Sequence, residues 1–312
     1  MSRKKLSIRE LRGSDFEALI DLFKSSFPRE LEISGFDREA ARKQLRLYRV
    51  LKLLQRLTRR PFVLFYVGEV GGEVIAAVSL NREKRSWYIG TVMVAPEHRR
   101  RGYGRAILEY GVGIAEKYGA QRVILHVLED NLPAKRLYES AGFACFERIV
   151  YLKKEPPEVE GIPLPHGYKL RKIDLFDRRA SRLIYAAMEP ESAEIYGEPE
   201  PTPWYLRPLA RIQPGVRERH AVVHGDEWVG IYTFSAPFAE KGAASAGISL
   251  LRQHRGAGLE EALLSLALKR AKGIGCPRLI VRADERNSPL LSACGRLGFE
   301  RLYVMEGMYR RL

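Results

Sequence analysis

The chain has 312 residues, 46% of them apolar and 10% aromatic, which is enough material for two ordinary globular domains of about 150 residues each. No stretch approaches the roughly 18 uninterrupted apolar residues of a membrane-spanning helix, so we expect no membrane partner. The formal net charge is +15, and it is unevenly distributed: residues 1–154 hold 30 Lys and Arg against 18 Asp and Glu, whereas residues 155–312 hold 23 against 20. Such a basic half is typical of proteins that bind nucleic acid, an acidic surface or a phosphorylated small ligand.

The cysteines indicate a reducing compartment. Cys145, Cys276 and Cys294 are odd in number, far apart and without CxxC spacing, so they predict neither a disulfide framework nor a metal site. The basic N-terminus lacks the apolar segment of a secretory signal. We therefore expect a cytoplasmic protein that needs no metal.

Hydrophobic periodicity predicts an alternation of strands and helices in the first half. Leucines at helical spacing in residues 36–60 predict an amphipathic helix, with eight Lys or Arg and no acid between 40 and 60. The glycines at 71 and 72 predict a hairpin turn. In chain order the expected elements are a strand over Leu6–Leu11, a helix after Asp15, the basic helix, strands Phe62–Val70, Val74–Leu80 and Tyr88–Val94, a helix over Ala106–Tyr118, a strand over Arg122–Val127, a helix and a last strand.

The second half repeats this order, which indicates a tandem duplication. The loop glycines Gly102 and Gly256 are 154 positions apart, and Asn131 and Asn287 are 156 apart. The matching elements are strand Tyr168–Ile173, a helix after Asp177, and strands His220–His224, Trp228–Phe234, Ala244–Leu250 and Arg278–Ala283.

The two copies are separated by a proline-rich segment. Residues 155–166 contain four prolines and show neither helical nor strand periodicity, which is typical of a linker. The predicted domains are residues 1–154 and 167–312, joined by residues 155–166.

A glycine loop in the first copy has the chemistry of an anion site. A strand ends at Val94, and Arg99-Arg-Arg-Gly-Tyr-Gly-Arg105 then opens a helix. Backbone N–H groups at a helix N-terminus and the helix dipole favour a phosphate, and glycines allow it to approach closely. A Gly-x-Gly loop that only turns the chain and caps a helix is the competing interpretation.

A second motif lies 27 residues after this loop. Asn131-Leu-Pro-Ala-Lys-Arg-Leu-Tyr138-Glu-Ser-Ala-Gly-Phe143 completes a pattern that, together with Arg99, Gly102 and Gly104, resembles the GCN5-related N-acetyltransferase (GNAT) superfamily. The resemblance covers most of residues 6–153 and, more weakly, 168–312. It implies an α/β (α+β) fold of two GNAT-like modules, each a mixed, mostly antiparallel central sheet flanked by helices.

The resemblance also implies a co-substrate and its contacts. Members use acetyl-CoA, whose pyrophosphate is expected on the loop and whose pantetheine arm is expected along the preceding strand and at Asn131. The implied binding residues are Val92, Met93, Val94, Arg99, Arg100, Arg101, Gly102, Tyr103, Gly104, Arg105, Asn131 and Ala134.

Tyr138 is the expected catalytic residue. When an amine attacks a thioester, a phenol can donate a proton to the departing thiolate or stabilise its charge. A tyrosine that only packs beside its helix is the competing interpretation. The amine must also lose a proton, and Glu97, Tyr88 and His126 are the candidate bases, with no choice among them.

The second copy departs from the motif. Gln253, Gly256 and Gly258 keep the loop pattern, but Leu290 and Cys294 stand where the first copy has Ala134 and Tyr138. We expect this copy to be degenerate in catalysis, with its CoA binding open.

The function predicted is transfer of an acetyl group from acetyl-CoA to a primary amine on a small molecule, protein or peptide. An RNA- or protein-associated acyl-CoA-binding protein with a regulatory or structural second domain is the alternative, since the basic helix suits nucleic acid although no RNA-binding motif is present. A non-catalytic acyl-CoA-binding regulator is a third reading, against which the intact Tyr138 counts. Tandem members of the family include the mycothiol synthases, so the amine of a thiol-bearing metabolite is one acceptor to consider.

Overall fold

The computed structural model describes residues 6–28, 38–58, 61–83, 86–201, 207, 215–236 and 242–312. These form two compact units. The first unit comprises Met1–Cys145 and Gly307–Leu312, and the second comprises Phe146–Glu306.

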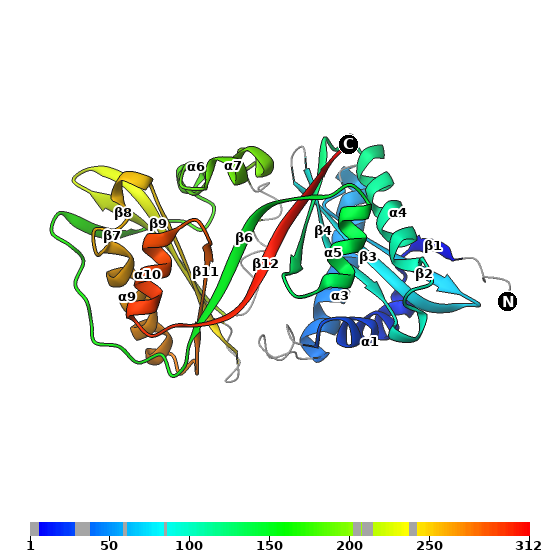
Figure 1. The fold of residues 1–312 in the computed structure, drawn as a ribbon, viewed down its shortest axis with the longest axis horizontal. Helices are drawn as coiled ribbons and strands as arrows, with labels where there is room; N and C mark the ends of the chain where they lie inside the picture. Colours follow the sequence, from blue (N-terminus) through cyan, green and yellow to red (C-terminus); the bar gives the residue numbers. More distant parts are fainter. Residues whose placement is uncertain are drawn as a thin grey trace. The chain divides into compact units, whose positions relative to one another are not determined.

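The first unit follows the predicted order of elements (Figure 1). Its sheet has the strand order β1-β2-β3-β4-β5-β12, in which β4 and β5 are parallel and the pairs β1–β2, β2–β3 and β3–β4 are antiparallel. The elements are β1 (Ser7–Glu10), η1 (Gly13–Asp15), α1 (Phe16–Ser26), α3 (Arg38–Thr58), β2 (Val63–Val70), β3 (Glu73–Glu83), β4 (Ser86–Val94), η2 (Pro96–His98), α4 (Tyr103–Lys117), β5 (Arg122–Leu128) and α5 (Leu132–Ser140).

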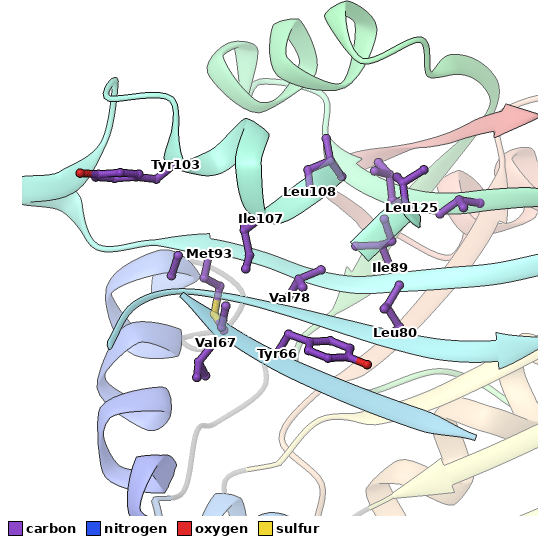
Figure 2. Close-up of a cluster of buried hydrophobic side chains, with 14 of the residues drawn as sticks. Tyr66, Val67, Val78, Leu80, Ile89, Met93, Tyr103, Ile107, Leu108 and Leu125 are labelled. Atoms are coloured by element: carbon purple, nitrogen blue, oxygen red, sulfur yellow. The ribbon is translucent and has the colours of Figure 1, made fainter. Parts of the chain in front are cut away.

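Helices cover the sheet of the first unit on both faces. Helix α4 packs on β2, β3 and β4, and α1 packs on β3 and β4 from the other side (Figures 1 and 2). Figure 2 shows Ile107 and Leu108 of α4 directed at buried side chains of the strands, among them Val78 and Ile89. Each such buried aliphatic side chain contributes about 1.5–3 kcal/mol, so this layer fixes where the start of α4 lies on the sheet.

The basic helix predicted over residues 36–60 is α3, an amphipathic helix over Arg38–Thr58. Arg38 and Arg42 pair with Glu17 of α1, and Lys52 pairs with Glu10 of β1. Arg59 and Arg60 lie outside the described residues. Part of the basic face therefore holds the helix against its own unit.

The second unit has the strand order β12-β6-β11-β10-β9-β8-β7, with β10 and β11 parallel. Its elements are β6 (Ala144–Lys154), β7 (Tyr168–Lys172), α6 (Arg178–Ala186), α7 (Pro190–Tyr196), β8 (Val216–His224), β9 (Glu227–Ala236), β10 (Ala244–Leu250), η4 (Arg252–His254), α9 (Leu259–Gly273), β11 (Leu279–Asp284), α10 (Ser288–Arg296) and β12 (Glu300–Arg311). Each unit thus has a mixed, mostly antiparallel sheet flanked by helices, as the resemblance implied.

The last strand of each copy is exchanged. Strand β6 follows α5 along the chain but pairs with β11 of the second unit, while Gly307–Leu312 at the end of β12 belong to the first unit. Met308 is buried in the core of the first unit, and Arg310 donates to the carbonyl oxygen of Ala141 at 2.9 Å. The compact units therefore do not follow a single cut in the chain, and the domain boundary at residues 155–166 stays a prediction.

None of the described helices is both long and apolar enough to cross a membrane.

Candidate active site

The strands β4 and β5 separate in the middle of the first unit's sheet. Among the described residues their ladder ends at the pair Ile89–Leu125, and β4 carries an extra residue, Gly90, where its register with β3 shifts. A Cβ at Gly90 would lie 2.9 Å from the Ser79 hydroxyl, so a side chain does not fit there. Such a bulge bends the strand, and here it turns β4 away from β5.

Three polar aromatic side chains gather where the strands part. His126 is the first residue of β5 beyond the paired segment, and its Nδ1 lies 3.2 Å from the Tyr88 hydroxyl of β4. Tyr138 of α5 is 7% exposed and packs beside Phe143. Burial raises the pKa of Tyr138, and the neighbouring Tyr88 raises it further. Tyr88 is thus hydrogen-bonded to His126 and lies near enough to Tyr138 to act on it electrostatically.

The raised pKa limits what the Tyr138 phenol can do. A phenol that holds its proton more tightly than usual is a weaker acid than a thiol, whose pKa is near 8.5. Donating a hydrogen bond to a departing thiolate is then favourable, whereas full proton transfer to it is uphill. The raised pKa favours stabilisation of the thiolate charge over donation of a proton to it.

The glycine loop leads into α4 with a left-handed backbone. Arg100 has φ +58° and Gly102, the N-cap of α4, has φ +85°. A Cβ at Gly102 would meet nothing within 4 Å, and the Gly102 N-cap makes no side-chain capping hydrogen bond. The first turn of α4 therefore presents backbone N–H groups to an open space, which suits the phosphates that the fold implies.

The four arginines of the loop have different surroundings. Arg99 donates from Nε to the Val94 carbonyl oxygen at 3.0 Å, and Arg105 donates to the Ser140 hydroxyl and carbonyl oxygens, both at 2.9 Å. Arg100 and Arg101 are exposed beside Gly102. Arg99 and Arg105 brace the loop, whereas Arg100 and Arg101 suit contacts with phosphate.

Several other predicted binding residues also have structural roles, which the sequence did not distinguish from contacts with coenzyme A. The side chains of Met93 and Tyr103 lie in the core, which leaves only their backbone for a ligand. The Asn131 side chain caps α5 by accepting from the Ala134 N–H at 3.3 Å. Val92 and Val94 lie on the part of β4 beyond its pairing with β5, where a pantetheine arm could extend the sheet.

Of the three candidate bases, Glu97 has neighbours other than the tyrosines. It is exposed in η2, where its carboxylate groups with Glu73 and His98 within 4.8 Å. Tyr88 and His126 are hydrogen-bonded to each other. These contacts distinguish Tyr88 and His126 from Glu97, which the sequence did not.

The second unit lacks this cluster. In its parallel ladder Ser245 pairs with Ile280, as Tyr88 pairs with Ile124, and Arg282 follows the last paired residue as His126 does. Cys294 on α10 is fully buried, and burial raises its pKa to about 12. Its thiol therefore stays protonated and is a poor donor.

Comparisons with known proteins identify the family of this chain. The model of the acetyltransferase (GNAT) family matches residues 16–143 and 183–299. The mycothiol acetyltransferase of Thermomonospora curvata is 27% identical over 234 residues, which are 71% of this chain and 73% of that protein. The streptothricin acetyltransferase of Streptomyces lavendulae is 35% identical over 77 residues, which are 25% of this chain and only 40% of that protein.

A solved structure has the same fold. The tandem GNAT protein from the clavulanic acid biosynthesis pathway aligns over 98% of both chains with a TM-score of 0.67 and 18% identity. Because the family model matches well over half of the residues, in two successive regions, the chain belongs to the GNAT acetyltransferase family and is an acyltransferase.

Proposed function

We propose that this protein transfers an acetyl group from acetyl-CoA to a primary amine, and that residues 1–154 form the catalytic module while residues 167–312 form a non-catalytic one. The observation that carries the proposal is the cluster of Tyr138, Tyr88 and His126 where β4 parts from β5. None of the three has a counterpart of the same type in the second unit.

The residues of the first unit suit acetyl-CoA, which would supply the acetyl group as a thioester. Arg100, Arg101 and the backbone from Gly102 to Gly104 would hold its phosphates at the start of α4. The edge of β4 over Val92–Val94 would hold its pantetheine arm, and Asn131 and Ala134 at the start of α5 lie on the motif expected to contact it. Arg99 and Arg105 would act indirectly, by bracing the loop.

Tyr138 would stabilise the sulfur that leaves. As the amine nitrogen bonds to the acetyl carbon, the carbon–sulfur bond breaks and negative charge builds up on sulfur. A buried phenol that keeps its proton offers a hydrogen bond to that charge in a site of low dielectric constant, where the bond is strong. The thiolate then takes a proton from solvent.

The hydrogen-bonded pair of Tyr88 and His126 would accept the proton that the amine loses. Imidazole is the side chain suited to taking up a proton near neutral pH, and the hydrogen bond at Nδ1 fixes the orientation of the ring. A protonated amine loses two protons on its way to the amide, and both pass to solvent; the thiolate takes one up, so the overall reaction releases one proton.

The acceptor is proposed by class only. The relative named mycothiol acetyltransferase makes the amine of a thiol-bearing metabolite the first acceptor to test. The alternative, an RNA- or protein-associated acyl-CoA-binding protein, has less support because Arg38, Arg42 and Lys52 of the basic helix are paired with acids of their own unit. A cytoplasmic location also stays a prediction.

The test is a screen of amines with acetyl-CoA in which released thiol is measured. We expect the wild-type protein and Cys294→Ala to acetylate the same acceptor at rates within a few-fold of each other, and Tyr138→Phe to be impaired. Activity that persists in Tyr138→Phe and disappears in Cys294→Ala would assign catalysis to the second module instead.

A further inference from the structure

The glycine loops of the two units match residue by residue at one spacing. Gly102 and Gly258 are both N-caps with left-handed φ, +85° and +78°, and they are 156 positions apart in the chain. Arg255 donates from Nε to the Leu250 carbonyl oxygen at 3.1 Å, as Arg99 does to Val94. The loop is thus in the same register as Asn131 and Asn287, and the spacing of 154 inferred from the glycine pattern is wrong by two.

This register changes which residues correspond. Gly256, with φ +82°, takes the place of Arg100, whose φ is +58°. Glu260, in the first turn of α9, takes the place of Gly104 in the first turn of α4. The second unit therefore carries an acid at the position where the first unit has a glycine without a side chain.

The Glu260 carboxylate fills the anion site of its own loop. Its two oxygens accept from the Gly256 N–H at 3.0 and 3.1 Å, and the residue is 1% exposed. A buried carboxylate is costly unless hydrogen bonds and favourable charge surround it. The backbone N–H and the positive end of the α9 dipole supply both, as they would for a phosphate.

The cation of this loop is also engaged inside the unit. The Arg255 side chain is 11% exposed and donates to the Glu189 carboxylate at 2.8 Å and to the Ala187 carbonyl oxygen at 2.6 Å, and Arg252 also pairs with Glu189. In the first unit Arg99 donates to the carbonyl oxygens of Val94 and Ser25, and Arg100 and Arg101 are exposed.

We propose that Glu260 is a built-in substitute for the phosphate of coenzyme A, and that it closes the second module to the co-substrate, so that each chain binds one coenzyme A. The carboxylate accepts the N–H hydrogen bond that a diphosphate needs, and its negative charge repels a diphosphate. This inference rests on the proposed function for the statement that the first module binds coenzyme A.

Calorimetric titration with coenzyme A and thermal unfolding with and without inorganic pyrophosphate test the proposal. We expect the wild-type chain to bind one coenzyme A. Glu260→Gly recreates the residue of the first module, and pyrophosphate should then stabilise the second unit by several degrees in Tm, with a second coenzyme A site appearing. Glu260→Gln keeps the bulk without the charge and should gain neither.

The reciprocal change guards against a variant that fails to fold. Gly104→Glu should weaken coenzyme A binding to the first module at least 10-fold more than Gly104→Gln, which adds the same bulk. Equal losses in the two, or two coenzyme A molecules on the wild-type chain, would overturn the proposal, as would a folded Glu260→Gly variant that pyrophosphate does not stabilise. A wild-type chain that binds none contradicts the proposed function, while the pyrophosphate response still decides the role of Glu260.

Discussion

At the scale of single residues, the motif predicted which tyrosine to examine, and the structure supplied its surroundings. The sequence places Tyr138 seven positions after Asn131, but it cannot show that α5 brings the phenol beside Tyr88, which lies 50 positions earlier on β4. For the same reason Glu97, Tyr88 and His126 were equal candidates in the sequence. Long-range neighbours follow from strand pairing, and a single sequence does not state that pairing.

Tyr138→Phe is expected to lower kcat about 10²-fold or more while the dissociation constant of coenzyme A stays within about two-fold, because only the hydrogen bond to the leaving sulfur is lost. The phenyl ring keeps its packing beside Phe143, so folding should be unaffected. Steady-state kinetics and calorimetric titration separate the two quantities. Wild-type kcat in this variant would mean that another donor stabilises the sulfur.

His126→Gln is expected to lower the rate at neutral pH about 10²-fold and to shift the activity to alkaline pH, where the amine is already neutral. The matched control is Tyr88→Phe, which removes the hydroxyl that contacts Nδ1 and leaves the histidine, and it should cause a smaller loss. The readout is the dependence of kcat/KM on pH. An unchanged profile in His126→Gln would exclude histidine as the base.

At the scale of elements, composition and periodicity predicted most strands and helices within a few residues, because apolar alternation and helical spacing are local properties. The predicted strand Ala244–Leu250 is β10 with the same bounds, and α1 and α6 begin after Asp15 and Asp177 as expected. The bulge at Gly90 was missed, since it depends on the Ser79 side chain of the neighbouring strand. The loop register was misjudged because glycine matches alone cannot tell Gly256 from Gly258.

Gly102→Ala at the start of α4 is expected to weaken coenzyme A binding. Alanine at φ +85° costs about 1–2 kcal/mol, and the loop relieves it by rotating the N–H groups away from the phosphate site. Gly258→Ala is the matched control, because it places the same strain at φ +78° with open space around it, in the loop that Glu260 closes. Calorimetry should show weaker coenzyme A binding for Gly102→Ala only. If the two variants bind coenzyme A equally well, the phosphates do not lie on this loop.

The attachment of α3 to α1 is expected to weaken in acid. Arg42 and Arg38 hold the pKa of Glu17 at about 2, below its usual 4.5. A depressed carboxyl pKa means that the stabilisation is complete above pH 4.5 and is lost as pH falls toward 2. Protection of the Arg38–Thr58 amides against hydrogen exchange, corrected for the intrinsic exchange rate at each pH, should therefore fall over that range in the wild type, whereas Glu17→Gln should show less protection already at pH 7 and respond less to acid.

At the scale of the whole molecule, the duplication could be predicted and the exchange of strands could not. Both β6 and β12 are apolar strands that follow a helix, and nothing in their residues specifies which sheet each one joins. The exchange places Arg310 of the second copy on the end of α5, the helix that carries Tyr138. A residue near the end of β12 thus supports the helix that carries Tyr138.

Met308→Ala is expected to destabilise the first unit, in whose core it lies, by about 2–5 kcal/mol. Hydrogen exchange should show the effect in β5 and α5 and leave β10 and β11 protected. Leu312→Ala removes an exposed side chain from the same segment and serves as the control. Loosening confined to the second unit would contradict the assignment of this strand.

The exchange also sets the order of events during synthesis. The sheet of the first unit cannot close beside β5 until residues 307–312 have been made, which is after all residues of the second unit have been translated. The backbone contact from Leu312 to the Gln121 carbonyl oxygen spans 191 positions, and contacts of such long range form late in folding. A nascent chain that stops short of these residues already contains the loop at Gly102 and the motif at Asn131–Phe143 but lacks the last strand of the first unit's sheet, so under the proposed function we expect acetyl transfer only once translation has reached the end of β12.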